Sequence, residues 1–424
     1  MREDFLHYVW RFSYFNISNL TDTRGNSVKI INPGILNRNA GPDFHDARIE
    51  IDGVLWTGSV EIHINASDWY RHNHQTDPAY ENVILHVVWQ NDKPVSHPDG
   101  TEIPALELSG RISQDLLSKN DGLNACDKGI PCANSLTDIP EVKRRAWMDR
   151  ALANRLERKG ADILKLYKSS QSWEDTARTW LFRNLGHKVN AEPFERLAKA
   201  VPGKAIAKQS DSGETLEALL FGTAGFLSAD PADDYHRRLS GHYQLLARKY
   251  NLEERRLKES DWKFSRLRPA NYPTLRISQL ATLFTREPSV FNFLTEGKNL
   301  QVYENQFNLR ASDYWRRHHA FGKTSSRSYA KMGQNTGQYL VTNAVVPFLH
   351  TYGQATGRYE MCDKAVALLE ELPPESNTIL EKWKATGTDA LNAFDSQALI
   401  ERYNEYCVPK KCPRCLIGHE ILRS

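Results

Sequence analysis

The stretch from Asn37 to Trp89 constrains the fold of this chain more than any other. Apolar and polar residues alternate from Ala47 to Ile51 and again from Val60 to Ile64, and a third, apolar run covers Val83 to Trp89. Alternation of this kind, bounded by Gly and Asp, is typical of half-buried strands. We therefore predict a small sheet in the N-terminal part of the chain, with acidic side chains at its rim.

Three polar residues of this stretch indicate its chemistry. Asp43 stands immediately before one predicted strand, while Glu61 and His63 lie within the next. Because side chains alternate faces along a strand, Glu61 and His63 share a face and Ile62 points into the core. Carboxylates gathered without basic partners repel each other, and a hard divalent cation relieves this repulsion while it polarises a phosphate or activates water. The pattern predicts a Mg²⁺ or Mn²⁺ site.

This layout resembles the PD-(D/E)XK nuclease superfamily over residues 1–115. Pro42-Asp43 matches the first motif of that superfamily, and Glu61-Ile62-His63 matches its acid-x-Lys motif, with His63 where Lys is usual. The resemblance implies a restriction-endonuclease-like fold in which Asp43 and Glu61 bind the metal and His63 orients water or stabilises the phosphate. An acid on the preceding helix often completes such sites, and Glu3 is the candidate for it.

The whole chain also resembles an uncharacterised bacterial family, domain of unknown function 2851. The phrases that carry this resemblance are AGPDFHDARI, GSVEIHINASDW, ENVILHVVW, WKFSRLRP, LVTNAVVPFLHTYG and YCVPKKCPRCLIG. That family implies no activity, so function has to be argued from the residues.

Composition places the chain among soluble globular proteins. Its 424 residues are too many for one typical core, so two or three domains are expected. We find no apolar run long enough for a membrane span and no signal-peptide pattern in MREDFLHYVW, and we expect a cytoplasmic protein. The net charge of +3 is too small to indicate nucleic-acid binding by itself, although a local basic patch is compatible with it.

The pattern changes after the predicted sheet. Residues 116–140 are rich in Gly, Asn, Asp and Ser and are expected to be a linker. Cys126 and Cys132 lie in it and are expected to pack as ordinary small residues, the alternative being that they pair or bind a metal with a distant partner. Beyond Pro140 the apolar spacing becomes helical. We therefore predict an α+β chain: a mixed sheet with a flanking helix over residues 1–115, a mostly helical domain over 141–361, and a helical C-terminal segment over 362–424.

The segment from Ser67 to Tyr80 follows the Glu61 strand and is dense in polar residues. His72, His74 and Asp77 within it suit a metal site or the wall of an active site. The other interpretation is a polar connection across the sheet edge, with histidines that face water. Both interpretations remain open.

Two segments of the helical part mix basic and aromatic residues. Residues 262–276 and 314–331 combine arginines with Trp, Phe, Tyr and His, a mixture that suits phosphate binding and base stacking. The residues predicted to contact nucleic acid are Lys263, Arg266, Arg268, Arg276, Arg316, Arg317 and Lys323. The alternative is a polar contact between domains.

The cysteines are too few for a disulfide scaffold. Cys407, Cys412 and Cys415 have the spacing C-x4-C-x2-C, whose C-x2-C half lets two thiolates bind one tetrahedral ion. Cys362 is the first candidate for the fourth ligand and His419 the second. Zn²⁺ is favoured, but Fe4S4 stays open, because some nucleases of the superfamily above hold such a cluster with cysteines outside the catalytic core.

The leading hypothesis is a metal-dependent phosphodiesterase that acts on DNA or RNA. With His63 in place of Lys, its rate is expected to vary between about pH 6 and 8. One alternative is a non-catalytic nucleic-acid-binding or scaffold protein on a degenerate nuclease fold. Another is a transition-metal hydrolase of a small substrate, with His63, His72, His74 and Asp77 at its site. No ATP-binding P-loop motif occurs in the chain.

Overall fold

The computed structural model describes residues 1–37, 39–125, 129–228, 230–265 and 267–424. The chain divides into two compact units. Unit 1 contains residues 1–149, 377–389 and 399–424, and unit 2 contains residues 150–376 and 390–398. Arg266, a predicted nucleic-acid contact, and Cys126 lie outside the described residues.

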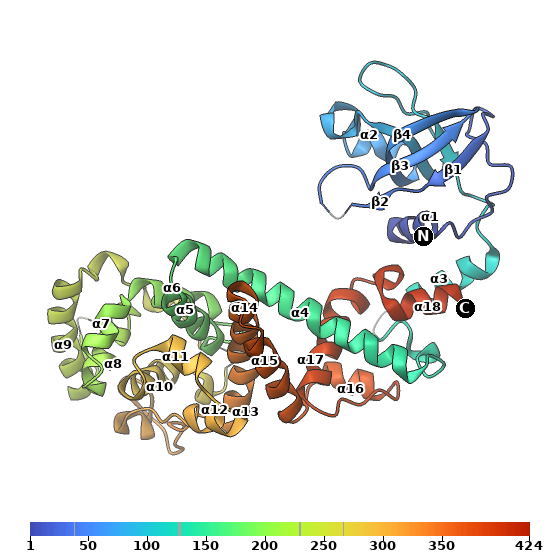
Figure 1. Ribbon diagram of the computed structural model, residues 1–424. Helices are drawn as coiled ribbons and strands as arrows, with labels where there is room; N and C mark the ends of the chain where they lie inside the picture. The colour runs from blue at the N-terminus through green and yellow to red at the C-terminus, as the bar shows by residue number, and fades with distance from the viewer. Residues whose placement is uncertain (38, 126–128, 229, 266) are drawn as a thin grey trace. The chain divides into compact units, whose positions relative to one another are not determined.

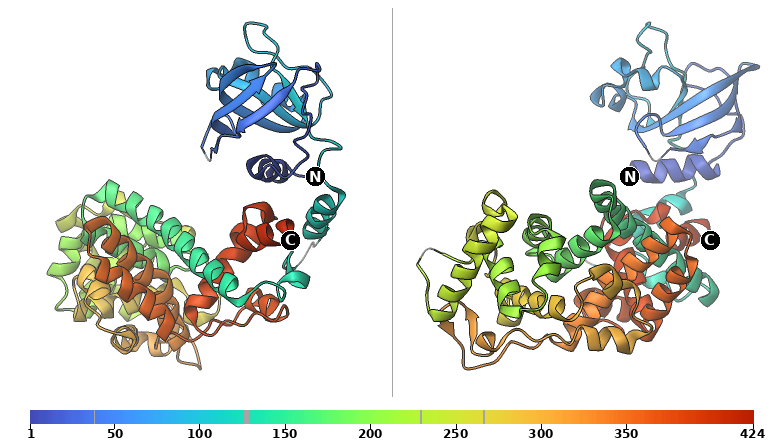
Figure 2. Two further views of the ribbon diagram at one scale, coloured as in Figure 1. Left: turned by 45° about the vertical axis from the view of Figure 1, so that its right-hand side comes forward. Right: turned by 60° about the vertical axis from the view of Figure 1, so that its left-hand side comes forward.

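Unit 1 contains a curled mixed sheet with the strand order β1-β3-β4-β5-β6, in which β2 also pairs with β3 (Figures 1 and 2). The strands are β1 (Val28–Asn32), β2 (Ile35–Leu36), β3 (Phe44–Ile51), β4 (Val54–Asn65), β5 (Val83–Gln90) and β6 (Ala105–Glu107). Strand β3 pairs antiparallel with β1 and β4, whereas β4, β5 and β6 are parallel to one another. The predicted α+β class, with a mixed sheet in the N-terminal part and helices after it, is confirmed.

The parallel pairing of β4 with β5 determines where the polar segment after β4 runs. Parallel neighbours need a crossover connection, because the chain has to return to the end of the sheet from which β4 started. Residues 66–82 make this connection through α2 (Asp68–Arg71), η1 (His74–Thr76) and η2 (Pro78–Tyr80). The crossover therefore carries its histidines back past β4.

Helices complete unit 1. α1 (Glu3–Phe12) packs against β4 and buries Phe5, Leu6, Val9 and Trp10. Further along the chain, α3 (Gln114–Ala125) occupies part of the segment that was expected to be a linker, and it packs against α18 (Leu416–Arg423). α16 (Thr378–Lys384) also belongs to this unit.

Unit 2 is mostly helical (Figure 1). α4 (Glu141–Ser170) begins in unit 1 and continues into unit 2, and α17 (Ala393–Arg402) likewise has residues in both. The other main helices are α5 (Trp173–Leu185), α6 (Ala191–Ala200), α7 (Gly203–Lys208), α8 (Gly213–Thr223), α9 (Asp234–Tyr250), α10 (Pro273–Arg286), α11 (Val290–Thr295), α12 (Leu300–Gln306), α13 (Gln334–Leu340), α14 (Val346–Thr356) and α15 (Tyr359–Glu371). A short hairpin of β7 (His318–Ala320) and β8 (Lys323–Thr324) accompanies them. Among the described residues, no helix has both the length and the apolar character that crossing a bilayer requires.

Candidate functional site

Asp43 and Glu61 meet where β3 begins beside β4. The antiparallel register places Phe44 opposite Val60, so the residue before β3 falls next to Glu61. The backbone N–H of Asp43 donates to Oε2 of Glu61 over 3.0 Å, and the N–H of Ile62 donates to Oδ2 of Asp43 over 3.0 Å. The structure thus brings together the two acids that the sequence pattern singled out.

Helix α1 adds two titratable residues next to Asp43. Nε2 of His7 lies 3.1 Å from Oδ2 of Asp43. Glu3, the predicted outer carboxylate, lies one helical turn before His7. The charge of His7 lowers the pKa of Glu3, and the charge of Asp43 raises it. His7 was not among the residues predicted from the sequence, although its i, i+4 spacing from Glu3 places both side chains on one helix face.

The crossover segment brings His74 to Glu61 and His72 to His63, which lies on β4 beside Glu61. Oε1 of Glu61 lies 3.6 Å from Nε2 of His63 and 3.3 Å from Nε2 of His74. Nε2 of His63 lies 3.2 Å from Nδ1 of His72, and one ring nitrogen from each of these three histidines lies within 4.8 Å of the other two. Three imidazoles and one carboxylate oxygen are a donor set that first-row transition metals favour.

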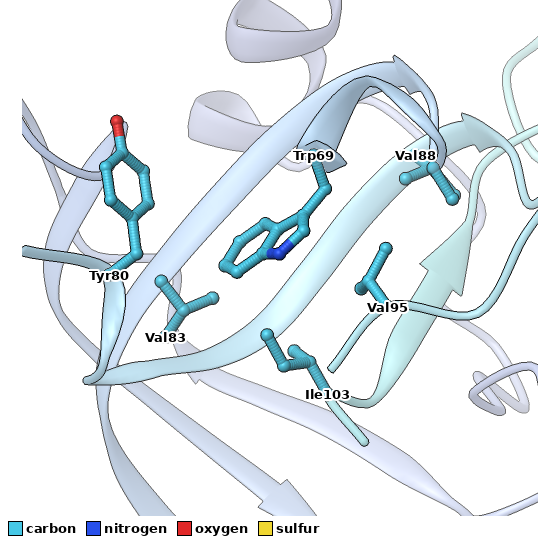
Figure 3. Close-up of a cluster of buried hydrophobic side chains, with 7 residues drawn as sticks. Trp69, Tyr80, Val83, Val88, Val95 and Ile103 are labelled. Atoms are coloured by element: carbon cyan, nitrogen blue, oxygen red, sulfur yellow. The ribbon is translucent and has the colours of Figure 1, made fainter. Parts of the chain in front are cut away.

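Figure 3 shows a cluster of buried hydrophobic side chains, two of which, Trp69 and Tyr80, contact histidine rings of the site. The cluster consists of Ala66, Trp69, Tyr80, Val83, Val88, Val95 and Ile103. The fully buried ring of Trp69 contacts the rings of His74 and His86 at centroid distances of 5.4 Å and 5.6 Å, and the ring of Tyr80 stacks on His74 at 3.8 Å. Because these aromatic rings are themselves packed in the core, they restrict the orientations available to the imidazoles.

Burial controls the protonation of His63 and His86. Nδ1 of His63 lies 2.8 Å from Nε2 of His86. Burial, followed by repulsion from His86, lowers the pKa of His63 to about 2, and burial lowers the pKa of His86 to about 3. Both rings are therefore neutral near pH 7, so the predicted variation of the rate between about pH 6 and 8 would have to come from a group other than His63. A neutral imidazole held through its other nitrogen suits metal ligation rather than the cationic role of Lys.

Burial and neighbouring charges shift the pKa values of Glu61, Glu3 and His7. Glu61 is 4 % exposed rather than at a solvated rim, and burial, followed by the charge of Asp43, raises its pKa to about 9. Burial also raises the pKa of Glu3. For His7, burial lowers the pKa, but the contact with Asp43 outweighs it, so the pKa is raised overall. A buried carboxylate beside a second acid is the arrangement that a bound cation stabilises.

Asp77 does not join the histidine group. Its side chain is exposed and accepts a 2.9 Å hydrogen bond from the N–H of Ala79, which caps η2. Its role in the structure is to start this turn.

The two basic and aromatic segments adjoin each other in unit 2. The ring of Tyr272 packs on the ring of His319 at 5.8 Å, and the hydroxyl of Thr274 donates to the carbonyl of His319 over 2.7 Å. The predicted contact residues that are exposed on these segments are Lys263, Arg268, Arg316, Arg317 and Lys323.

Arg276 differs from the other predicted contacts. It is 1 % exposed, and its guanidinium donates to side-chain oxygens of Gln279, Asn271 and Thr336. The prediction that Arg276 presents its charge to a phosphate on the surface is therefore wrong. Its guanidinium instead hydrogen-bonds these side chains in the interior of unit 2.

The C-terminal cysteines have a neighbour that the spacing pattern did not single out. Cys407, Cys412 and Cys415 belong to unit 1, and the thiols that act electrostatically on Cys407 are those of Cys132, Cys415 and Cys412. Cys362 belongs to unit 2, where its thiol lies 3.4 Å from the carbonyl oxygen of His350.

His419, the other candidate for the fourth ligand, packs against aromatic rings of α1. Its ring centroid is 4.8 Å from that of Phe12 and 5.4 Å from that of Tyr8. Among the described residues, no three of the predicted cysteine and histidine ligands at this end of the chain bring their ligand atoms within 4.8 Å of one another.

Comparisons with known proteins add one finding. A family model described as "Protein of unknown function (DUF2851)" matches residues 3–378, which confirms the resemblance that the running sequence suggested. No curated protein and no solved structure matches the chain.

Proposed function

The chain belongs to the DUF2851 family of proteins of unknown function, and from its site we propose that it is a metal-dependent phosphodiesterase that acts on DNA or RNA. The observation that carries this proposal is the convergence on Oε1 of Glu61 of two imidazole nitrogens, from His63 at 3.6 Å and from His74 at 3.3 Å. The other oxygen of the same carboxylate accepts the N–H of Asp43, so a second acid adjoins the first.

The order of elements around the site supports a PD-(D/E)XK-type arrangement. α1 is followed by the antiparallel strands β1, β3 and β4, then by α2, and then by β5 parallel to β4. In this order, Pro42-Asp43 precedes one strand and Glu61-Ile62-His63 lies within the next, as in the motifs of that superfamily. The superfamily assignment remains part of the proposal.

The donor set favours Mn²⁺ over Mg²⁺. Glu61, His63, His72 and His74 would hold the ion. Imidazole suits Zn²⁺, Fe²⁺ and Ni²⁺ best, and of the two expected ions the transition metal Mn²⁺ fits this mixed set better, because Mg²⁺ prefers oxygen ligands and retained water. A divalent ion bound there polarises a phosphate oxygen and lowers the pKa of a bound water.

His63 and His7 have different roles in this proposal. His63 stays neutral and serves as a ligand, oriented through its Nδ1 by His86. His7 lies 3.1 Å from Asp43, and this contact raises the pKa of His7, so its protonated form would supply beside the acids the positive charge that the neutral His63 lacks. A cation at this position stabilises the negative charge that accumulates on phosphate in the transition state.

The nucleic-acid class of substrate is supported by unit 2. Two segments distant in sequence adjoin there and present exposed Lys and Arg side chains together with Tyr272 and His319. In a chain with a net charge of only +3, this is a local concentration of positive charge. Such a surface suits the phosphate backbone and, through its rings, unpaired bases.

The test is cleavage of single- and double-stranded DNA and RNA by the purified full-length chain with Mn²⁺. We expect cleavage that EDTA abolishes and that Glu61→Gln lowers by about 10²-fold or more, because the carboxylate that holds the ion is lost. Glu50→Gln is the matched control, since Glu50 lies on β3 and its nearest basic partner is Lys29, at 4.0 Å. No cleavage of any nucleic acid, or equal cleavage by Glu61→Gln, contradicts the proposal.

The three-histidine group also favours a second candidate, a transition-metal hydrolase of a small substrate. Hydrolysis of bis(p-nitrophenyl) phosphate without cleavage of nucleic acid would support this candidate, especially if Arg268→Ala leaves the rate unchanged. Binding of nucleic acid that is steeply salt-dependent, insensitive to EDTA and accompanied by neither reaction would identify a non-catalytic binding protein.

A further inference from the structure

Unit 2 contains a pocket of about 820 Å³ that the proposed phosphodiesterase site does not use. The pocket lies where the end of α4, the start of α5 and the start of α7 meet, and residues at the end of α10 and before α11 complete its wall. Its volume falls within the range of pockets that hold small organic molecules in proteins, about 300–1,000 Å³. The side chains of the wall therefore indicate which kind of molecule the pocket would take.

Arg178 brings a buried positive charge to this wall. It lies on α5 and is 6 % exposed. Its Nη2 pairs with Oδ1 of Asp175 over 2.7 Å, whereas its Nε and Nη1 have no hydrogen-bond partner among the described residues. Buried donors without a partner cost free energy, and in proteins most of them are satisfied by a protein group, a water or a ligand. Arg178 therefore has more donors than its one carboxylate partner uses.

Glycine at position 203 lets the backbone of α7 lie against this guanidinium. Gly203 is the first residue of α7, and a Cβ at this position would overlap Nη1 of Arg178. The φ of Gly203 is not positive, so glycine is needed here for space rather than for its backbone conformation. The packing of α7 thus holds the guanidinium in place at the wall of the pocket.

The carboxylates of the wall already have protein partners. Glu174 accepts hydrogen bonds from the hydroxyl of Ser289 and from two backbone N–H groups at the start of α11, over 2.6–3.1 Å. Asp175 pairs with Arg178. A bound cation would have to compete with these donors for the same oxygens, so the wall favours an anion over a cation.

Two lysines and an apolar floor complete the wall. Lys199 pairs with Glu195 over 2.6 Å, whereas the exposed Lys204 has neither an ion pair nor a hydrogen bond from its side chain within the described part of the chain. The apolar floor consists of Leu166, Ile206 and Phe284. The pocket therefore combines an unpaired ammonium group and a buried guanidinium with an apolar surface.

We propose that this pocket binds a small organic anion, a phosphate ester or a carboxylate, with its charged group at Arg178 and Lys204 and its apolar part on the apolar floor. Guanidinium and ammonium groups form charge-assisted hydrogen bonds with both kinds of oxyanion. The site is separate from the proposed phosphodiesterase activity, because its binding requires neither the metal nor nucleic acid.

The test is binding of phenyl phosphate and of benzoate to the full-length protein freed of metal with EDTA. The rise in unfolding temperature with probe concentration measures binding of each probe, and the ³¹P line width confirms it for phenyl phosphate. We expect at least one probe to bind, and to bind at least about threefold more tightly than inorganic phosphate or acetate, respectively, which lack the apolar ring. The probe that binds identifies the oxyanion. No binding of either probe overturns the proposal.

Gly203→Ala tests the position of the guanidinium without removing a charge. We expect it to weaken binding at least about tenfold, because its methyl group displaces the side chain of Arg178. Gly213→Ala is the matched control, since Gly213 is the first residue of α8 and a Cβ there would lie 3.8 Å from the nearest atom, on Thr285. This control should bind the probe as the wild type does.

Lys204→Ala covers the case in which Gly203→Ala fails to fold, because Lys204 is exposed. It should weaken binding about threefold, as loss of an exposed ion pair does. Lys208→Ala, an exposed lysine of α7 outside the wall, and Arg268→Ala, on the basic and aromatic surface, should each leave binding unchanged. Unchanged binding in Lys204→Ala or in folded Gly203→Ala, or equal weakening in Lys208→Ala or Arg268→Ala, would overturn the proposal.

Discussion

Nε2 of His74 lies 3.3 Å from Oε1 of Glu61. This contact joins the crossover segment to the strand β4 that it covers, and it makes one site out of a carboxylate and histidines that are separate motifs in the sequence. Tyr80, at the end of the same crossover, stacks on His74 and holds the ring in this position. The site therefore depends on the packing of the crossover as much as on the sheet.

The first prediction concerns the core beneath the site. Trp69→Ala should lower the free energy of unfolding by about 3–5 kcal/mol, because it removes a fully buried aromatic ring and leaves a cavity. Trp56, which is 50 % exposed on β4, provides the control, and Trp56→Ala should change stability by only about 0.5 kcal/mol. Chemical denaturation followed by circular dichroism measures both. Equal effects of the two substitutions would show that the crossover does not depend on Trp69.

The second prediction concerns nucleic-acid binding by unit 2. Arg268→Ala and Lys323→Ala should each weaken binding and reduce the slope of log K against log salt concentration by about 1, because each removes one phosphate contact. Lys208→Ala, an exposed basic residue of α7, should leave the slope unchanged. Fluorescence anisotropy at several salt concentrations measures the slopes. An unchanged slope in both Arg268→Ala and Lys323→Ala would show that these residues do not contact the phosphates of the nucleic acid.

Arg276 should behave differently from its exposed neighbours. Arg276→Met should destabilise unit 2 by about 1–3 kcal/mol, because the side chains of Asn271, Gln279 and Thr336 lose a buried donor. At temperatures where the variant is folded, its salt-dependence slope should equal that of the wild type. The same denaturation and anisotropy measurements apply. A reduced slope with unchanged stability would show instead that Arg276 contacts nucleic acid.

The fourth prediction concerns pH. Burial, followed by the positive charge of Arg276, lowers the pKa of His187 to about 4, below its value of about 6.5 in an unfolded chain. The native state therefore binds fewer protons than the unfolded state below pH 6.5, so stability falls as the pH falls through this range. Between pH 7 and 5 the wild type should lose about 2 kcal/mol more than His187→Gln.

Denaturation at a series of pH values measures this difference. His242→Gln, which replaces an exposed histidine of α9, is the control and should follow the wild type. Parallel curves of stability against pH for the wild type and His187→Gln would contradict the lowered pKa of His187.

Part of the site was predictable because it depends on local patterns. Strand alternation placed Glu61 and His63, and the strand pairing then brought Asp43 to Glu61. The contribution of His7 could not be predicted, because it depends on how α1 packs against β4. The neutrality of His63 was missed for a similar reason: alternation predicts one buried face, whereas the crossover and the sheet bury His63 to 1 % exposure.

The helical part shows the same division between local and tertiary information. Helical periodicity predicted long helices after Pro140, and α4 and α9 follow that prediction. Composition alone could not distinguish the buried Arg276 from the exposed Arg268, because both stand in one segment of arginines and aromatic residues.

The most direct test of the account is calorimetric titration of metal-free protein with Mn²⁺, compared among the wild type, Glu61→Gln and His74→Ala. We expect the wild type to bind Mn²⁺ at this site and each variant to bind it at least about tenfold more weakly, because each removes one donor. Glu50→Gln should match the wild type. Equal affinity in the wild type and in both site variants would contradict the claim that Glu61 and the histidines form a metal centre.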